Sequence, residues 1–503
     1  MSRKSPQLTR RQVLKNGVSS AAVVAASATV LGNRPLSAAS YSRILGSNAG
    51  LRGATIGLNG RGRDHINGLK SHLVALCDCD EAVLGRTVDK FKADNNREVE
   101  SFSDFRKLLD RDDIDFVSVA TPNHTHSLIA IHAIQAGKDV YCEKPVSHNV
   151  WEGRQLVNAA AKYDRVVQSG TQSRSSPGLQ EALAYVQSGK LGKALYAVGT
   201  CYKPRKSIGK LDKPLQIPSN IDYDLWCGPA AKVDLYRPKL HYDWHWDFNT
   251  GNGDMGNQGI HQMDIARWFL GHETISPRVI SIGGRLGYDD AGDTPNTQTV
   301  IHDYASAPII FETRGLPKAK EFQDSRWGRS MDNYLGSQIG VIVFYENGRL
   351  VIPSYTKATA FDNDGNQLEA WDRGGNHYAN FLEAVESQDS SGLNAPIIEG
   401  HLSSALCHTG GVSHQVGQTA TVAEIMDSVT NDQFADSIDR MVQHLEANKI
   451  DLSKNPLTLG QDLKFDLDTE EVINNSAAAA LLKRVGREGF EVPEIQAAMA
   501  AKG

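Results

Sequence analysis

Residues 141–146, YCEKPV, place a lysine where a short β-type run ends. Ligands of open parallel sheets bind outside the carboxyl ends of the strands, so Lys144 can hold a substrate oxygen and stabilise charge that develops on it. Glu143 can orient this lysine, and Pro145 fixes the backbone behind it, as a trans or a cis bond. A lysine at a strand end is also a common surface residue, so the segment needs support from the rest of the chain.

A second group of reactive side chains lies in GNGDMGNQGIHQMDIARWFLG, residues 251–271. If a helix begins near Asp254, then Asn257, His261 and Asp264 lie on one face of it. An imidazole suits proton removal from an alcohol, and Asp264 could fix its tautomer. The alternative is a core histidine bonded to a neighbouring carboxylate.

A glycine-rich turn follows the first β-type run in ATIGLNGRGRDH, residues 54–65. Gly57, Gly60 and Gly62 let the backbone approach a pyrophosphate at a helix N-terminus, and Asn59 and Arg61 complete the predicted binding loop. Asn59 stands where the usual fingerprint has glycine, and Asn tolerates unusual backbone angles. An ordinary glycine-rich turn is the alternative.

Asp78 closes the second β-type run, HLVALCD, where a carboxylate can bind the adenosine ribose hydroxyls of a dinucleotide. No arginine follows directly to receive a 2′-phosphate, so NAD is favoured over NADP. Asp80 fits better as a residue at a helix start.

The segment ATPNHTHSL, residues 120–128, ends another predicted strand at the same sheet edge. Thr121, Pro122, Asn123 and His126 are therefore expected to line the cofactor site, together with Glu143 and Lys144. His124 and His126 could instead be plain loop or helix-capping histidines.

The elements that must position these residues alternate between strand and helix. β-type runs at 54–58, 72–78, 115–121, 139–145 and 165–170 are separated by helical patterns, which predicts an α/β domain with a parallel sheet covered on both faces. Beyond residue 175 the runs indicate an α+β domain with one large, mainly antiparallel open sheet, including a hairpin at Glu346, Asn347 and Gly348. The predicted division is 1–39 signal peptide, 40–50 linker, 51–175 nucleotide-binding domain, 176–425 substrate and oligomerisation domain, and 426–503 a mostly helical extension with one helix starting at Asp468.

Composition narrows the function classes. The chain has 503 residues, a net charge of -6 and no long basic block, so nucleic acid is not an expected partner. The six cysteines form no CxxC pair, which predicts neither a disulfide framework nor a zinc knuckle. His241, His245 and His261 lack a second acidic ligand at suitable spacing, so no metal site is expected.

The first forty residues have the pattern of an export signal. Paired Arg10 and Arg11 precede a short apolar stretch, and Ser37, Ala38 and Ala39 offer small residues for cleavage. This pattern resembles a twin-arginine signal, with Val13 where phenylalanine is usual. It predicts a periplasmic or otherwise exported protein that passes through the twin-arginine machinery without stable membrane insertion, and a basic N-terminal tail is the alternative. Twin-arginine substrates are exported folded, so the signal also predicts a tightly held cofactor.

The motifs GLNGRG, ALCD, ATPNHTH, AGKDVYCEKP, GTQSR, DLWCGP and GNGDMGNQGIHQMD, in this order, resemble the Gfo/Idh/MocA family of oxidoreductases. The resemblance implies a Rossmann domain, an open-sheet domain, a bound nicotinamide cofactor, a sugar-like substrate and assembly as dimers or tetramers through the open sheet. It also places Gln172 and Arg174 near the active site. The family usually has aspartate where Asn257 stands, which removes one potential base. Trp244 and Trp246 could stack on a sugar face or pack in the core.

These patterns predict an exported NAD(H)-dependent oxidoreductase that moves a hydride between a sugar-like or cyclitol hydroxyl and the cofactor, with Lys144 on the reacting oxygen and His261 as general acid and base. One alternative is an NAD-dependent glycosidase that works by transient oxidation and elimination. Another is a non-catalytic sugar-binding protein.

Overall fold

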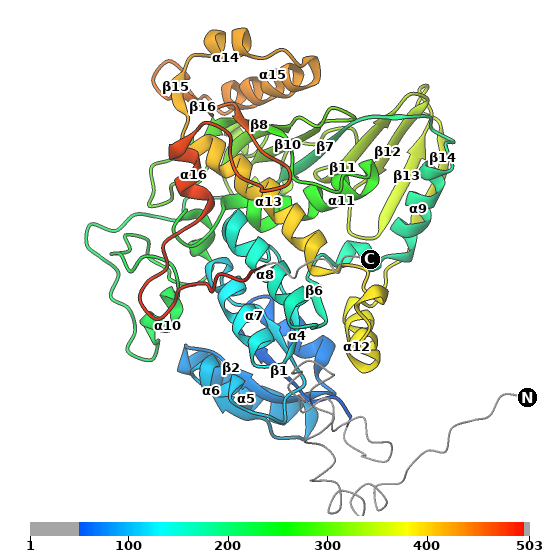
Figure 1. The fold of residues 1–503 in the computed structure, drawn as a ribbon. Coiled ribbons are helices and arrows are strands. Elements are labelled where there is room, and N and C mark those ends of the chain that lie inside the picture. The colour runs from blue at the N-terminus through cyan, green and yellow to red at the C-terminus, as the bar shows by residue number, and fades with distance from the viewer. Residues whose placement is uncertain (1–49, 497–503) are drawn as a thin grey trace, which may run out of the picture.

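The computed structural model describes residues 50–496. The predicted signal peptide and nearly all of the predicted linker lie outside the described residues. Figure 1 shows two sheets at opposite ends of the described structure in space, with helices between and around them.

The first sheet is a six-stranded parallel sheet with the order β3-β2-β1-β4-β5-β6, the doubly wound order of dinucleotide-binding folds. Its strands are β1 (Gly53–Ile56), β2 (Leu73–Cys77), β3 (Glu100–Phe102), β4 (Phe116–Val119), β5 (Asp139–Cys142) and β6 (Val167–Ser169). The five predicted β-type runs correspond to β1, β2, β4, β5 and β6. The sequence runs omitted β3, because this three-residue edge strand has no buried side chain and therefore no apolar signal.

The helices of this unit follow the strands. They are α4 (Gly62–Leu69), α5 (Glu81–Asn95), α6 (Phe105–Leu109), α7 (His126–Gln135) and α8 (Val150–Lys162). Asp80 caps α5 by accepting hydrogen bonds from the backbone N–H groups of Ala82 and Val83, and Asp104 caps α6 through Arg106. The cap at Asp80 matches the sequence interpretation.

The second sheet has eleven strands, and ten of them follow the order β14-β13-β12-β11-β7-β10-β9-β8-β16-β15. It is antiparallel except where β7 pairs with β10, and β11 and β12 form the predicted hairpin. The strands are β7 (Ala194–Tyr202), β8 (Arg278–Gly284), β9 (Thr297–His302), β10 (Ile309–Arg314), β11 (Ile339–Tyr345), β12 (Gly348–Ile352), β13 (Lys357–Phe361), β14 (Gln367–Asp372), β15 (Gln418–Ala420), β16 (Leu457–Leu459) and β17 (Leu463–Lys464), which pairs with β8.

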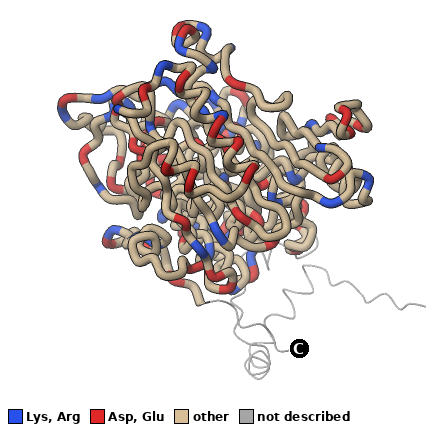
Figure 2. The backbone as a smooth tube through the Cα atoms, turned by 90° about the horizontal axis from the view of Figure 1, so that it is seen from above, with Lys and Arg blue, Asp and Glu red and all other residues tan. Residues whose placement is uncertain are grey.

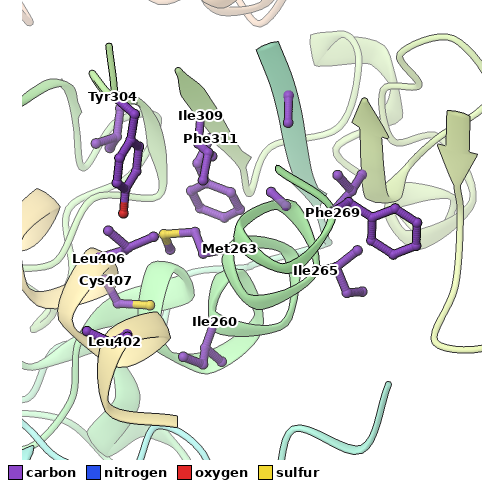
Figure 3. Packing of buried hydrophobic residues seen from close by; sticks show 14 of the residues in the cluster. Ile260, Met263, Ile265, Phe269, Tyr304, Ile309, Phe311, Leu402, Leu406 and Cys407 are labelled. Atoms are coloured by element: carbon purple, nitrogen blue, oxygen red, sulfur yellow. The ribbon is translucent and has the colours of Figure 1, made fainter. Parts of the chain in front are cut away.

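One face of this sheet packs on α11 (Ile260–Leu270) and α13 (Ile397–Gln415). Figure 3 shows Met263 of α11 between Phe311 of β10 and Leu406 of α13. These side chains are almost fully buried, so α11 is held rigidly at the centre of the molecule. The chain just before α11 therefore carries the candidate residues on a fixed support. A further helix, α9 (Pro177–Gln187), lies against β13 and β14.

The opposite face is covered near β8, β9 and β10 by α14 (Val422–Ser428) and α15 (Asp432–Ala447). Phe434, Ile438 and Met441 of α15 are buried against Ile282, Ile301 and other sheet residues, and Figure 1 shows both helices lying over the sheet. Part of the sheet surface that the resemblance assigns to oligomerisation is thus occupied by the chain's own helices.

The C-terminal extension differs from its prediction. Its last helix is α16 (Ser476–Leu482), capped by Asn475, whereas Asp468 lies in a turn. The prediction of a helix starting at Asp468 was therefore wrong. β16 and β17 also lie in this region, where both strands pair with β8 and the side chains of Leu457 and Leu463 are buried.

The core around the six-stranded sheet includes side chains from segments far along the sequence. Phe381 of α12 (His377–Ser387) is fully buried, and its ring packs edge-on against Phe116 and Tyr141 at centroid distances of 5.5 and 5.7 Å. Phe490 and Ile495 of the final segment join the core on the α7 side. The two sheets are therefore tied together by chain crossings rather than by a single linker.

The charges of the described surface are mixed. Figure 2 shows Lys and Arg positions interspersed with Asp and Glu positions along the backbone. Among residues 50–496, no helix combines the length and apolar character that crossing a bilayer requires.

Candidate active site

A cleft of about 420 Å³ lies along the carboxyl edge of the six-stranded sheet. Residues that follow β1, β2, β4 and β5 line it, together with His241, Tyr242, Trp244, His245 and Asn257 from later in the chain. The predicted residues on the lining are Gly57, Asn59, Gly60, Arg61, Asp78, Thr121, Pro122, Asn123, His126, Glu143, Lys144 and Asn257.

The glycine turn has the shape that close approach to a ligand requires. Gly57 has a φ of +85°, and a Cβ atom at Gly62 would lie 2.0 Å from the carbonyl oxygen of Gly57. A side chain at Gly62 would therefore open the turn before α4 begins. Gly62 does not line the cleft itself, so its contribution is to the packing of the turn.

Asp78 holds this turn against the end of β2. Its carboxylate accepts hydrogen bonds from the backbone N–H of Leu58 at 2.9 Å and of Asp80 at 3.0 Å, which leaves acceptor capacity for ligand hydroxyls. Burial raises the pKa of Asp78. Together with the glycine turn, this carboxylate fits the ribose and pyrophosphate of a dinucleotide, and Cys79 rather than a cation follows it.

His126 connects the chain that follows β4 to the chain that follows β5. Its ring nitrogens lie 2.7 Å from the carbonyl oxygen of Thr121 and 2.6 Å from that of Pro145. His124 connects in the same way to the carbonyl oxygens of Trp226 and Thr250. Both histidines therefore position backbone, and their burial lowers the pKa of each imidazole.

A long segment, residues 203–250, covers the cleft and contains α10 (Tyr223–Cys227). It is fixed near β2, where His241 Nε2 lies 2.9 Å from Asp80 and the side-chain amide of Asn220 donates to Asp80 at 2.7 Å. Tyr242 and Trp244 of this segment line the cleft. Trp244 was a candidate for stacking on a sugar, whereas the contacts of His241 and Asn220 with Asp80 were not predicted, because irregular backbone carries no periodic signal.

Glu143 is the centre of a buried charge network. It accepts hydrogen bonds from Arg61 Nε at 2.8 Å and from the backbone N–H of Lys144 at 2.9 Å, and His65 Nε2 lies 3.2 Å away. Burial alone would raise the pKa of Glu143, but His65 and Arg61 outweigh it and hold the pKa well below its usual range. Glu143 thus orients Lys144 through the main chain, and the following peptide bond to Pro145 is cis.

Lys144 reaches the second half of the chain. Its Nζ atom donates a hydrogen bond to the backbone carbonyl of Asn257 at 2.6 Å. Asn257 lies in a π-helical turn, η4 (Met255–Gly259), that leads into α11. A π turn adds a residue to the helical repeat and exposes backbone, as is frequent at functional sites.

His261 lies one turn further on and is buried. Its Nδ1 atom has no hydrogen-bond partner among the described residues, and its ring lies 4.8 Å from that of Tyr355. Burial first, and then the positive charge of Lys144, lower the pKa of His261 well below its usual value. The imidazole is therefore neutral at physiological pH and able to accept a proton.

Asp264 does not orient His261, and that part of the prediction was wrong. Its carboxylate accepts hydrogen bonds from Arg174 Nε at 2.9 Å and from Ser403 Oγ at 2.8 Å. His261 and Asp264 lie three residues apart in α11, but the Asp264 carboxylate is held by partners from the chain after β6 and from α13. Asp264 instead ties α11 to α13 and to the end of β6.

The three predicted substrate contacts do not line the cleft. Arg174 is buried and forms ion pairs with Asp264 and Glu399. Gln172 precedes it in the 3-10 helix η2 (Gln172–Ser175). Trp246 is buried, with the Arg205 guanidinium 5.0 Å from its ring centroid, so the core alternative describes it better than stacking on a sugar.

Two polar residues near the π turn were missed. Lys203 Nζ donates to Gln258 Oε1 at 3.2 Å, and the amide of Gln258 donates to the Tyr355 hydroxyl at 3.1 Å. Lys203 follows β7 and Tyr355 follows β12, so their convergence depends on the register of the second sheet. Their sequence neighbourhoods contain no motif. Within residues 50–496, no cluster of His, Cys, Asp and Glu has the arrangement of a metal site.

A doubly wound sheet whose carboxyl-edge cleft is lined by a glycine turn, Asp78 and Lys144 defines an oxidoreductase of the nucleotide-binding type. His261 is buried and is not among the residues that line this cleft. Residues 51–171 match the profile described as oxidoreductase family, NAD-binding Rossmann fold, and residues 186–339 match that of the oxidoreductase family, C-terminal alpha/beta domain. The chain belongs to this Gfo/Idh/MocA family, as its motifs predicted.

Named relatives come from sugar and cyclitol metabolism. The chain is 27% identical over 260 residues to levoglucosan dehydrogenase of Pseudarthrobacter phenanthrenivorans, covering 48% of this chain and 58% of that protein. It is 27% identical over 158 residues to inositol 2-dehydrogenase of Salmonella paratyphi B, covering 30% and 46%. The chain thus spans about half the length of the curated relatives it matches.

The fold is also similar to solved structures. The WlbA dehydrogenase of Bordetella pertussis, solved in complex with NADH and UDP-GlcNAcA, aligns with a TM-score of 0.53 and 16% identity. The alignment covers 72% of this chain and 96% of that protein. At this identity the likeness concerns the fold alone.

Proposed function

We propose that the protein is an NAD(H)-dependent dehydrogenase acting on a hydroxyl group of a sugar-like or cyclitol substrate. The observation that carries this proposal is that Lys144 lines the carboxyl-edge cleft and is bonded to the π turn that leads to the buried, neutral His261. The family and the names of its dehydrogenase relatives support the same class of reaction.

Lys144 holds the reacting oxygen in this mechanism. Its ammonium group has three N–H donors, and the carbonyl of Asn257 takes one, so others are free for a substrate oxygen. The nicotinamide, when bound, supplies the hydride acceptor or donor. Lys144 stabilises the negative charge that develops on the oxygen as the hydroxyl becomes a carbonyl.

His261 takes the hydroxyl proton in the oxidative direction and returns it in the reductive direction. Its lowered pKa keeps the base form available, and its Nδ1 atom is not engaged by another described group. Asn257 supplies no carboxylate, so the base is His261 alone.

The first test is to denature the purified protein, identify any released nicotinamide by mass spectrometry, and measure its redox state after incubation with sugars and cyclitols. The proposal expects bound NAD or NADH whose redox state changes with a substrate, and Lys144→Ala is expected to abolish this change while retaining the nucleotide. A protein that neither contains nor binds NAD or NADP contradicts the proposal.

Product analysis separates the alternatives. Release of an aglycone from a glycoside with no net redox change supports a glycosidase that oxidises its substrate transiently. Sugar binding with no turnover in either assay supports a binding protein.

We further propose that the protein is exported through the twin-arginine route to the periplasm. The support is the sequence pattern around Arg10 and Arg11. Outside the cytoplasm the free NAD pool is small, so the cofactor stays bound and is recycled by a second substrate or by return of the hydride. Replacing both arginines by lysine is expected to leave the protein in the cytoplasm, as fractionation would show, while unchanged export would contradict the proposal.

Self-association is the remaining proposal. Because α15 covers the sheet near β8 to β10, the surface available to a second copy is the part formed by β11 to β14. Light scattering coupled to gel filtration tests this expectation, and a monomer at micromolar concentration would contradict it.

A further inference from the structure

Lys203 belongs to the same polar group as the proposed catalytic residues. It lies directly after β7 and donates to Gln258, the neighbour of Asn257 in the π turn. Gln258 in turn donates to the hydroxyl of Tyr355, whose ring lies 4.8 Å from that of His261. The ammonium groups of Lys144 and Lys203 are therefore bound to consecutive residues of one turn.

The charges around this turn do not cancel. Arg61 is paired with Glu143 at 2.8 Å, and Arg205 with Asp254 at 2.6 Å. In the described part of the chain, neither Lys144 nor Lys203 has a carboxylate partner, since the acceptors of both are neutral amide oxygens. Two partly buried ammonium groups thus contribute uncompensated positive charge beside the proposed reaction centre.

Uncompensated charge in a partly buried site is costly unless a ligand supplies the counter-charge. Burial lowers the pKa of Lys144, the nearby Glu143 carboxylate raises it in part, and the cations Arg61 and Lys203 lower it further. An anion bound between the two lysines would relieve this repulsion and favour the charged form of Lys144. A neutral polyol would not.

We propose that the substrate is a sugar acid and that Lys203 binds its carboxylate, while Lys144 binds the hydroxyl to be oxidised. This inference rests on the proposed function and narrows its substrate class. Lys203 would then determine specificity without taking part in hydride transfer. A carboxylate is preferred to a larger anion because Lys203 presents a single ammonium group and the described site offers no second free cation besides Lys144.

The test measures equilibrium binding and hydride transfer separately. Calorimetry on the NAD-loaded full-length protein compares glucuronate, galacturonate and gluconate with the methyl esters of the two uronates and with glucitol. The inference expects the preferred acid to bind about 10- to 100-fold more tightly than its neutral counterpart, the range of one hydrogen bond to a charged group. Higher salt should weaken the binding of the acid and leave the binding of its neutral counterpart unchanged.

Variants of Lys203 then test whether this residue causes the preference for acids. In Lys203→Gln, the affinity for the acid should fall to within about twofold of the affinity for its neutral counterpart. Lys203→Arg should restore most of the preference for the acid. Lys206→Gln, an exposed neighbour, is the matched control and should change neither value. The inference falls if no acid is preferred, or if Lys203→Gln leaves the preference intact. Oxidation of neutral sugars without any preference for acids overturns this inference and leaves the proposed function standing.

Discussion

The Nζ atom of Lys144 lies 2.6 Å from the backbone carbonyl oxygen of Asn257, so the lysine at the end of β5 is fixed by main chain rather than by a side chain. This contact does not depend on the identity of residue 257. The family's usual aspartate can therefore be introduced without removing the lysine's anchor.

Asn257→Asp is expected to fold like the parent and to shift the pH profile of kcat/KM. The pKa of Lys144 is lowered by burial, and an added carboxylate beside it would raise that pKa again. Because Lys144 acts as a cation, a higher pKa retains activity to higher pH, by about one unit or more. Asn257→Ala should leave the alkaline limb unchanged, and an identical alkaline limb in the aspartate variant would contradict the assigned role of Lys144.

His261→Asn is expected to slow hydride transfer by about 10²- to 10⁴-fold, the usual range for removal of a general base, with nucleotide binding unchanged. In the parent, the pKa of His261 lies well below its ordinary value, so the neutral base persists as pH falls. The rate of alcohol oxidation should therefore show no loss from this group between about pH 8 and pH 6. Pre-steady-state fluorescence of NADH measures both effects. A fall in rate centred near the ordinary histidine pKa in the parent, absent from the variant, would show that the ring is not shielded.

Asp78→Ala is expected to weaken NAD binding by about 10- to 100-fold, because the ribose loses a charged acceptor and the turn loses its bonds to Leu58 and Asp80. Asp78→Asn separates the two effects, since an amide oxygen can still accept one of these bonds. Titration with NAD and NADP gives the readout. Equal losses for both nucleotides in the asparagine variant would contradict a contact with the ribose hydroxyls.

The sequence predicted which strand ends meet at the cleft, because this relation is local. Gly57, Asp78 and Lys144 each lie at the end of a short buried run, and the parallel topology brings strand ends to one edge whatever the rest of the chain does. The same reasoning could not place Asp264, because its partners Arg174 and Ser403 come from segments far away in the sequence.

The substrate side depends on long-range register. Lys203 and Tyr355 both reach Gln258 only because β7 and β12 flank β11. Similarly, α12 reaches the first sheet only because the chain crosses back from the second sheet. Neither relation leaves a local pattern in the residues concerned. Phe381 and Trp246 show the same limit, since an aromatic side chain in an irregular or amphipathic segment is compatible with either a core or a binding role.

His302 is buried in β9 with no hydrogen-bond partner on either ring nitrogen among the described residues. Burial lowers its pKa to about 3. The unfolded chain binds a proton near the ordinary histidine value while the folded protein does not, so the stability present above that value is lost as pH falls toward the folded pKa. His302→Leu should therefore remove a slope of about 1.4 kcal/mol per pH unit from the free energy of unfolding across this acidic window. Thermal unfolding followed at several pH values checks this prediction. The curves of parent and variant should run parallel above neutral pH and diverge below it, and parallel curves down to about pH 4 would mean that the folded protein protonates His302 as readily as the unfolded chain does.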